Sequence, residues 1–132
     1  MSTELTMLAW TLVLALVQVF LPIGGRTRQL GSKWNAGPRD EPTPPPDLIT
    51  GRLERAQRNL YETLPIFAAA VLIANVAGRE GSISALGAQL YFWARLIYVP
   101  LYAFGVPYIR SLVWLISFVG LLMVLAAVFG LA

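Results

Sequence analysis

The amino-acid sequence predicts an all-α integral membrane protein, built as a bundle of four transmembrane helices. Composition is the first reason: of 132 residues, 57% are hydrophobic and only 13% are charged, whereas soluble domains carry about 25% charged residues. Spacing is the second reason, because four apolar stretches follow one another, each long enough to cross a hydrocarbon core about 30 Å thick. A soluble core of this size has no room for so many apolar side chains, so the sequence favours a bilayer.

The first predicted helix covers residues 5–23, an apolar run interrupted only by Thr6, Thr11 and Gln18. A secretory signal peptide is the alternative interpretation, and it requires a basic start and a cleavage site of small residues. The chain instead starts with the acidic Glu4, and the run ends in Leu-Pro-Ile-Gly-Gly. We therefore interpret this run as a transmembrane helix.

Residues 24–47 form a predicted loop that is polar, basic and rich in proline and glycine. Proline fixes φ and has no backbone N–H, so we expect irregular or polyproline-like chain here, with no helix across residues 44–46. Either Asp47 or Thr50 is a suitable cap for the following helix. Loops of this length are uncommon in compact domains, which leaves two interpretations open, a functional lid or a tether.

Three further helices are predicted, at residues 48–77, 83–104 and 108–131. The first third of the 48–77 helix is charged and the rest is apolar. A kink is expected at Pro65, because proline donates no hydrogen bond to the preceding turn. The 83–104 helix contains Arg95, and the last helix has no charge beyond its first turn. The four helices give one transmembrane domain that includes the whole chain.

The basic residues predict the orientation in the membrane. Seven of the ten lysines and arginines lie between Arg26 and Arg58, and Arg110 follows the third loop. Cytoplasmic loops carry an excess of Lys and Arg, so we expect loops one and three in the cytoplasm and both termini outside. In a bacterium, the membrane would be the inner membrane. Basic residues gathered in one loop indicate membrane topology rather than a nucleic-acid partner.

A charged face on the 48–77 helix is the first candidate for a binding site. At about 100° per residue, its polar residues fall on one arc of roughly 120°, and they are Arg52, Arg55, Arg58, Asn59 and Glu62. The 83–104 helix adds a polar and aromatic stripe at helical spacing, made of Tyr91, Arg95, Tyr98 and Tyr102. A charge at membrane depth costs on the order of 3 kcal/mol, so it normally faces a bundle interior and has partners.

Two explanations of these charges differ in their charge balance. An ion-pair network that only fixes helix packing needs acids to match the arginines, and Glu62 is the single acid on these faces. The arginine excess instead favours an external anion, because guanidinium groups hold carboxylates and phosphates through paired hydrogen bonds. Asn59 and Glu62 suit an amine on the same ligand, and a phospholipid headgroup is the alternative anion. Without Cys or His, a thiolate or imidazole metal site is excluded.

The same residues resemble a known family. Arg55-Ala-Gln-Arg-Asn59, followed by Glu62, Pro65 and Phe67, is similar to the second-helix signature of the membrane-associated proteins in eicosanoid and glutathione metabolism, the MAPEG family. Ala94-Arg95-Leu96, with Tyr98, Tyr102 and Arg110, resembles the pattern of the third and fourth helices of that family. The resemblance covers essentially the whole chain and is to the bacterial branch of the family.

This resemblance implies a homotrimer of four-helix subunits, with glutathione bound as a co-substrate between adjacent subunits near the cytoplasmic face, and with no metal. The glutathione-binding residues that it implies are Arg52, Arg55, Arg58, Asn59, Glu62, Arg95, Tyr98 and Tyr102. It also implies that Arg110, with Ser111 beside it, is the catalytic residue that acts on the thiol.

The expected function is therefore a microsomal-type glutathione transferase or peroxidase, which activates the thiol against lipophilic electrophiles that arrive from the lipid phase. Some family members bind lipids and catalyse nothing, so the alternative is a non-catalytic binding protein for lipid or amphipathic anions that uses the same pocket. A small multidrug exporter is the weakest interpretation, because it needs a membrane-embedded acid in the first helix, where residues 5–23 offer only Gln18.

Overall fold

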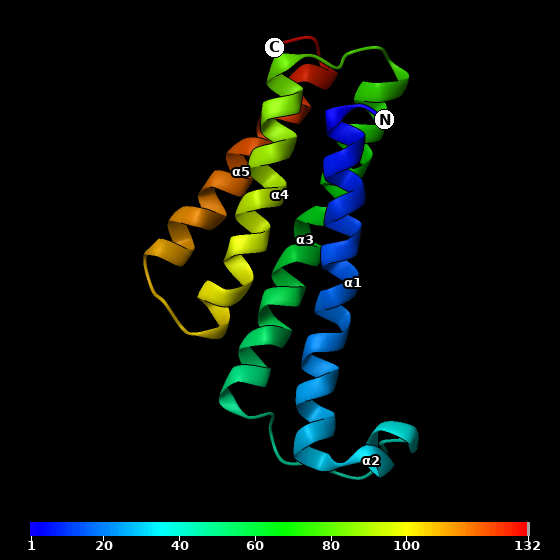
Figure 1. The fold of residues 1–132 in the computed structure, drawn as a ribbon, viewed down its shortest axis with the longest axis vertical. Helices are drawn as coiled ribbons and strands as arrows, with labels where there is room; N and C mark the ends of the chain where they lie inside the picture. Colours follow the sequence, from blue (N-terminus) through cyan, green and yellow to red (C-terminus); the bar gives the residue numbers. More distant parts are fainter. Residues whose placement is uncertain (132) are drawn as a thin grey trace.

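A computed structural model describes residues 1–131, and these residues form helices and connecting turns without a β-strand. The helices are α1 (Thr3–Leu30), α2 (Ser32–Ala36), α3 (Leu48–Val76), α4 (Ser82–Ala103) and α5 (Ile109–Val128). Four long helices run up and down beside one another, and both chain ends lie at one end of the bundle (Figure 1). The short α2 lies at the opposite end, beside the end of α1.

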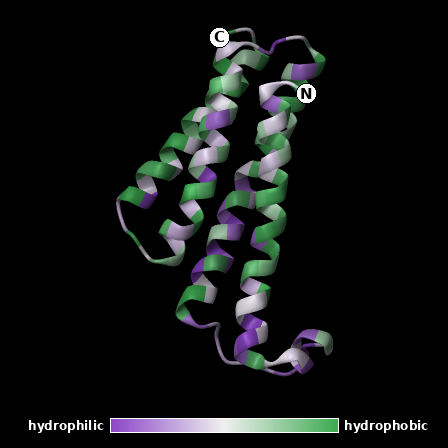
Figure 2. Cartoon of the chain, viewed as in Figure 1, coloured by the Kyte–Doolittle hydropathy of each residue, from purple (hydrophilic) through white to green (hydrophobic). Residues whose placement is uncertain are grey.

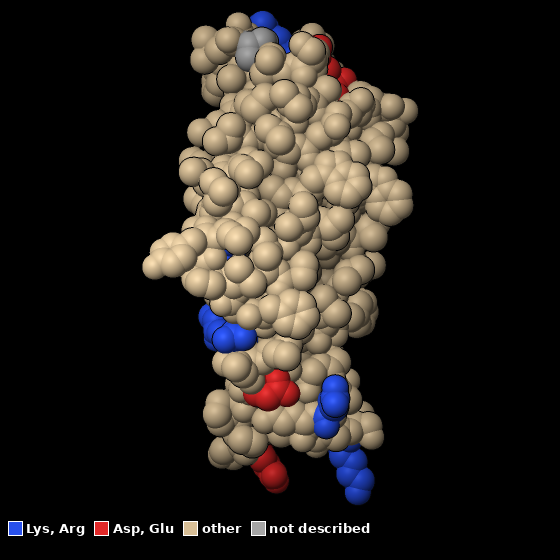
Figure 3. Space-filling model, turned by 60° about the vertical axis from the view of Figure 1, so that its left-hand side comes forward, with Lys and Arg blue, Asp and Glu red and all other residues tan. Residues whose placement is uncertain are grey.

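The lengths and hydropathy of the helices, together with the surface, confirm the prediction of an all-α membrane protein. Three helices, α1, α3 and α5, are long and apolar enough to cross a membrane. In Figure 2, α5 is largely hydrophobic, whereas the first half of α3 is largely hydrophilic. On the face drawn in Figure 3, acidic and basic side chains lie at the upper end and over the lower third, and the broad band between them is almost free of charge. Such a band matches the hydrocarbon layer of a bilayer.

The closest packing in the bundle is between α4 and α5. Two glycines allow it: a Cβ atom on Gly87 would lie 2.6 Å from the carbonyl oxygen of Gly120, and one on Gly120 would lie 2.5 Å from that of Gly87. Small residues bring helix backbones together in membranes, where dispersion contacts replace the hydrophobic effect between helices. The pair therefore fixes how α5 is docked on α4.

An aromatic pair joins α3 to α4 in the core. The rings of Phe67 and Tyr91 stack with their centroids 4.0 Å apart. The Tyr91 hydroxyl forms a hydrogen bond of 2.8 Å with the hydroxyl of Thr63, so the buried phenol has a partner. Leu60 and Val71 are completely buried beside this pair. The stack sets the register of α3 against α4, and with it the level at which their polar residues meet.

Polar side chains hold the N-terminus to the turn between α3 and α4. The Ser2 hydroxyl donates to Glu80 at 2.6 Å, and the Asn75 amide donates to the same carboxylate at 3.1 Å. Ser84 donates to the carboxylate of Glu4, which is buried. Because these contacts pair the acids with hydroxyl and amide donors, the polar residues at this end of the bundle contribute to structure.

The predicted boundaries of the first helix and of the loop after it are wrong. The α1 helix continues past residue 23 to Leu30, and α2 follows within the segment 24–47 that was expected to be irregular. Gly25 allows the extension to pack closely on Thr50. Arg26 then donates to the carbonyl oxygen of Pro44 at 2.9 Å, so the proline-rich chain supplies acceptors to the helix. These tertiary contacts outweigh the weak helix propensity of the Gly-Gly sequence.

The other helix boundaries agree with the prediction more closely. The α3 and α4 helices begin and end within one residue of the expected ranges 48–77 and 83–104, and α5 ends at Val128 rather than at residue 131. Asp47 is the residue that caps α3, because its side chain accepts a hydrogen bond of 2.8 Å from the backbone N–H of Thr50.

Candidate functional site

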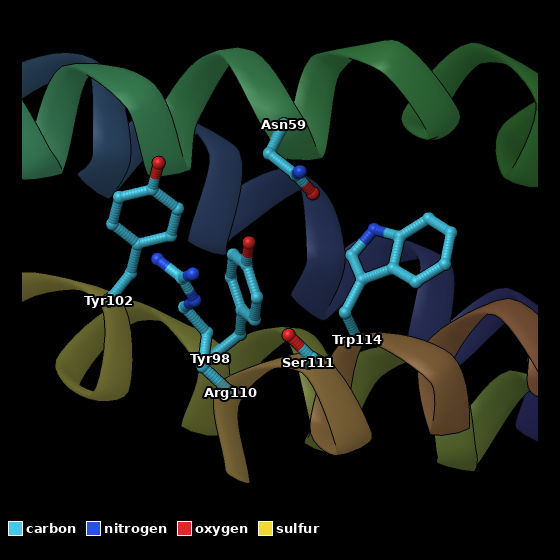
Figure 4. A pocket seen from close by; sticks show the side chains of 6 residues that line it. All are labelled: Asn59, Tyr98, Tyr102, Arg110, Ser111 and Trp114. Carbon is cyan, nitrogen blue, oxygen red and sulfur yellow. The ribbon is translucent and has the colours of Figure 1, made fainter. Parts of the chain in front are cut away.

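Side chains from three helices surround a cavity of about 320 Å³ on the α3, α4 and α5 side of the bundle. Figure 4 shows them converging, and they are Asn59 from α3, Tyr98 and Tyr102 from α4, and Arg110, Ser111 and Trp114 from α5. Five of these six residues belong to the site predicted from the sequence. The helices bring them together although they lie far apart in the chain.

The two tyrosines form one wall of the cavity. They are four residues apart on α4, so they lie on the same face of the helix. Their rings meet edge to face, with centroids 5.5 Å apart and an angle of 63° between the planes. Figure 4 shows both hydroxyl groups pointing toward α3, on which the Asn59 amide points back toward α5. The wall is therefore aromatic at its base and rich in hydrogen-bonding groups at its rim.

Three guanidinium groups lie against these two rings. The Cζ atom of Arg110 is 4.6 Å from the ring centre of Tyr102, and that of Arg55 is 5.9 Å from the same ring. The Cζ atom of Arg95 is 4.6 Å from the ring centre of Tyr98. Rings attract cations through their negative faces. No carboxylate is among the six residues that line the cavity, so the charge of its lining, from Arg110, is positive.

Arg95 is the most unusual of the three because it is buried without a partner. Its side chain is 1% exposed, and within the described chain none of its three guanidinium nitrogens has a hydrogen-bond partner. The buried Oδ1 atom of Asn59 also lacks one. Burying a charge or a polar atom without compensation is costly. The presence of a costly buried charge at Arg95, behind the Tyr98 ring, indicates that this charge has a role beyond packing.

Three of the predicted site residues neither line the cavity nor stack on its tyrosine rings. The side chain of Arg52 donates to the carbonyl oxygen of Ala103 at 3.3 Å, which satisfies the C-terminal end of α4. The guanidinium group lies so close to Gly105 that a Cβ atom there would be 2.7 Å away, and φ of this glycine is +67°. Arg58 lines a different cavity on the α1 side of α3. Glu62 is exposed on α3.

The turn between α4 and α5 determines where Arg110 points. Tyr108 precedes α5 with φ of +46°, a conformation that is rare for a bulky residue. Ile109 then starts the helix, so Arg110 projects from its first turn toward Tyr102. Backbone strain of this kind is concentrated at functional sites, where the surrounding structure holds it. The strained turn therefore supports the interpretation of Arg110 as a functional residue.

Trp114 is a lining residue that the sequence argument missed. It lies one helical turn after Arg110 on α5 and stacks on Phe118, with ring centroids 5.4 Å apart and an interplanar angle of 11°. Its spacing of four residues from Arg110 was the available signal. In a helix that is otherwise apolar, however, a tryptophan is also expected as a lipid-facing residue. It gives the cavity an apolar wall opposite Tyr102.

Comparison with known proteins identifies the family of this chain. The sequence model of the MAPEG family matches residues 7–130, which is nearly the whole chain. No curated protein and no solved structure matches the chain. The match includes α3, α4 and α5 and every residue that lines the cavity. The protein is therefore an integral membrane protein that belongs to the MAPEG family.

Proposed function

We propose that this protein binds glutathione at the cavity between α3, α4 and α5 and activates its thiol against lipophilic electrophiles. The observation that carries the proposal is the excess of positive charge: the guanidinium groups of Arg55, Arg95 and Arg110 lie against two tyrosine rings, and the lining contains no acid. Such a cavity needs an anionic ligand. Membership of a family that includes glutathione-dependent enzymes supports glutathione as that ligand.

Glutathione has two carboxylates, one ammonium group and a thiol, and several residues here suit these groups. Arg55 is exposed beside the cavity and suits a carboxylate, while the unpartnered Oδ1 atom of Asn59 suits an N–H donor. Glu62 lies one turn after Asn59 on α3 and suits the ammonium group. Glu62 is exposed on a single subunit. The proposed trimer would cover this face of α3, so that glutathione lies between neighbouring subunits.

The chemistry requires the thiolate, because the thiol itself is a poor nucleophile. The guanidinium group of Arg110 favours the anion by charge proximity, so the thiol proton is released more readily to solvent. The sulfur then forms a bond to the electrophilic carbon while the leaving group departs with its electron pair. Ser111, which follows Arg110, offers a hydroxyl donor at the same edge of the cavity. Trp114 gives the lipophilic reactant an apolar surface.

The membrane arrangement is also a proposal. We expect α4 to cross the membrane together with α1, α3 and α5, because its charged residue Arg95 is buried and presents no charge to lipid. Loops one and three would then face the cytoplasm with the basic end of the bundle, and both termini would lie outside. The glutathione cavity would lie near the cytoplasmic side, where glutathione is supplied.

The test compares Arg110→Ala with the wild-type protein and with a matched control, Arg28→Ala. Arg28 is exposed and does not line the cavity. We expect conjugation of chlorodinitrobenzene to fall by about 100-fold in Arg110→Ala, the usual cost of removing one transition-state donor. Calorimetry should still detect glutathione binding. Normal turnover by Arg110→Ala would reject the role of this arginine at the thiol.

The same measurements separate the enzyme from a non-catalytic binding protein. A wild-type protein that binds no glutathione by calorimetry, yet retains a phospholipid that is lost in Arg55→Gln, would show that the cavity holds a lipid anion instead. Binding of glutathione without conjugation or peroxide reduction would show a binding role only. Turnover with saturable glutathione binding is the outcome that the proposal predicts.

A further inference from the structure

A second cavity, which the proposed function does not use, lies on the other side of α3. Its volume is about 340 Å³, and its walls come from α1, from the segment around α2 and from α3. The residues that line it are Val19, Pro22, Ile23, Arg26, Trp34, Arg39, Glu54, Gln57 and Arg58. We call it the Trp34 cavity. The two cavities share no lining residue, although both use α3 as a wall.

Trp34 lies at the centre of the cationic part of this cavity. The Cζ atom of Arg39 is 4.5 Å from the indole ring centre, and that of Arg26 is 5.5 Å from it. Arg58 is the third arginine of the lining, and Glu54 is its single acid. Indole attracts cations and so keeps two guanidinium groups close together despite their repulsion. The Trp34 cavity therefore holds an excess of two positive charges.

The Trp34 cavity is formed before any ligand arrives, because hydrogen bonds hold the segment that closes it. Arg26 donates to the hydroxyl of Thr43 at 2.9 Å, and Asn35 donates to the hydroxyl of Thr27 at 2.8 Å. Arg39 donates to the carbonyl oxygen of Asn35 at 3.0 Å. Its backbone has φ of +58°, a left-handed conformation that is uncommon outside glycine. Backbone strain at a residue that lines a cavity, as at Arg39, is typical of binding sites.

The wall from α1 changes from apolar to cationic along the helix axis. Val19, Pro22 and Ile23 form the apolar part, and Arg26 follows at the end of the same wall. At 1.5 Å per residue, Val19 and Arg26 are roughly 10 Å apart along the helix. The headgroup zone on each side of a bilayer is roughly 5–8 Å thick, so a wall of this length can extend from hydrocarbon into the headgroups. The Trp34 cavity thus crosses the boundary between the two zones, and tryptophan is enriched at that boundary.

We propose that the Trp34 cavity binds the phosphate of an anionic phospholipid headgroup. Guanidinium groups attract phosphate oxygens. Arg58 supplies one such group, and Arg26 and Arg39 add positive charge and their remaining N–H donors. The apolar wall of Val19 and Ile23 contacts the upper part of an acyl chain. A soluble phosphate compound has no use for that wall, which distinguishes the two sources of the same chemistry. Basic pockets between helices on the cytoplasmic side bind such headgroups.

The test measures lipid retention by native mass spectrometry after reconstitution into nanodiscs of phosphatidylglycerol or phosphatidylcholine. The double variant Arg26→Gln/Arg39→Gln removes two cations, and Arg28→Gln is the control because Arg28 lines neither cavity. Each basic residue near the surface contributes about fivefold in affinity, so retention of phosphatidylglycerol should fall by about 30-fold in the double variant. Arg28→Gln should retain it within twofold of the wild type.

Three results would overturn the proposal. They are equal retention of phosphatidylcholine and phosphatidylglycerol by the wild type, an equal loss in Arg28→Gln, and displacement of the lipid by millimolar inorganic phosphate. The last result would assign the site to a soluble phosphate compound. If the double variant does not fold, the single variant Arg39→Gln decides, with an expected loss of about fivefold. Calorimetry with glutathione reports on the other cavity, so failure of either proposal leaves the other one testable.

Discussion

Replacing Arg95 with methionine should stabilise the protein and weaken its ligand binding at the same time. Arg95 is 1% exposed, and its guanidinium nitrogens have no hydrogen-bond partner within the described chain. Methionine has a similar length and no charge, so Arg95→Met removes the uncompensated charge without leaving a large cavity. Because the charge of Arg95 lowers the stability of the protein, we infer that this charge contributes to ligand binding.

The changes in unfolding free energy and in ligand affinity can both be worked out from electrostatic contributions. An arginine at membrane depth costs on the order of 3 kcal/mol, and the contact with the Tyr98 ring at 4.6 Å returns about 1–2 kcal/mol. Arg95→Met should therefore raise the free energy of unfolding by about 1–2 kcal/mol, or the midpoint temperature by roughly 3–10 °C. A ligand carboxylate about 8 Å from the guanidinium group, across the Tyr98 ring, loses about 2 kcal/mol at an effective dielectric constant near 20, or about 30-fold in affinity.

Thermal unfolding in detergent, with and without glutathione, measures both effects. At a glutathione concentration of about 100 times the wild-type Kd, the wild type should gain about 2.7 kcal/mol and Arg95→Met about 0.9 kcal/mol. The exposed Arg28 gives the control variant Arg28→Met, which should match the wild type. A lower midpoint for Arg95→Met without glutathione would refute the reasoning, because it would show that the guanidinium group stabilises the bundle.

Two further predictions concern the scaffold. Gly120→Leu should lower the free energy of unfolding by about 2–3 kcal/mol, because its Cβ atom would lie 2.5 Å from the Gly87 carbonyl oxygen. The control is Gly24→Ala, since a Cβ atom at Gly24 would have open space around it. In thermal unfolding, this control should be as stable as the wild type or more stable. The hydrogen bond from the Thr50 backbone N–H lowers the pKa of Asp47 below its ordinary value of 3.8. A carboxyl whose pKa is lowered by folding stabilises the folded state when the pH is above the ordinary pKa. This stabilisation is lost as the pH falls through the lowered pKa. Circular dichroism should therefore show fraying of α3 below about pH 4 in the wild type, whereas Asp47→Asn should lose no helix in this range because its amide cap does not titrate.

Local patterns were sufficient to predict most of the helices. The lengths of the apolar runs determined α3 and α4 to within one residue, because a helix satisfies its own backbone groups and needs only a suitable sequence in a bilayer. Spacing also predicted that Tyr98 and Tyr102 share one face of α4, and the edge-to-face contact of their rings agrees. The continuation of α1 to Leu30 could not be predicted, because acceptors on the distant proline-rich segment stabilise it.

The candidate site, too, could be predicted in part from the sequence. Composition and helical spacing were enough to predict the excess of arginine over acid and the residue types that a polar anion site needs. They could not predict how the charged arc of α3 is divided, with Asn59 in one cavity, Arg58 in another, and Arg52 at the end of α4. Helical spacing gives the direction in which a side chain points from its own helix. What the side chain contacts depends on the packing of α1 on one side of α3 and of α4 and α5 on the other.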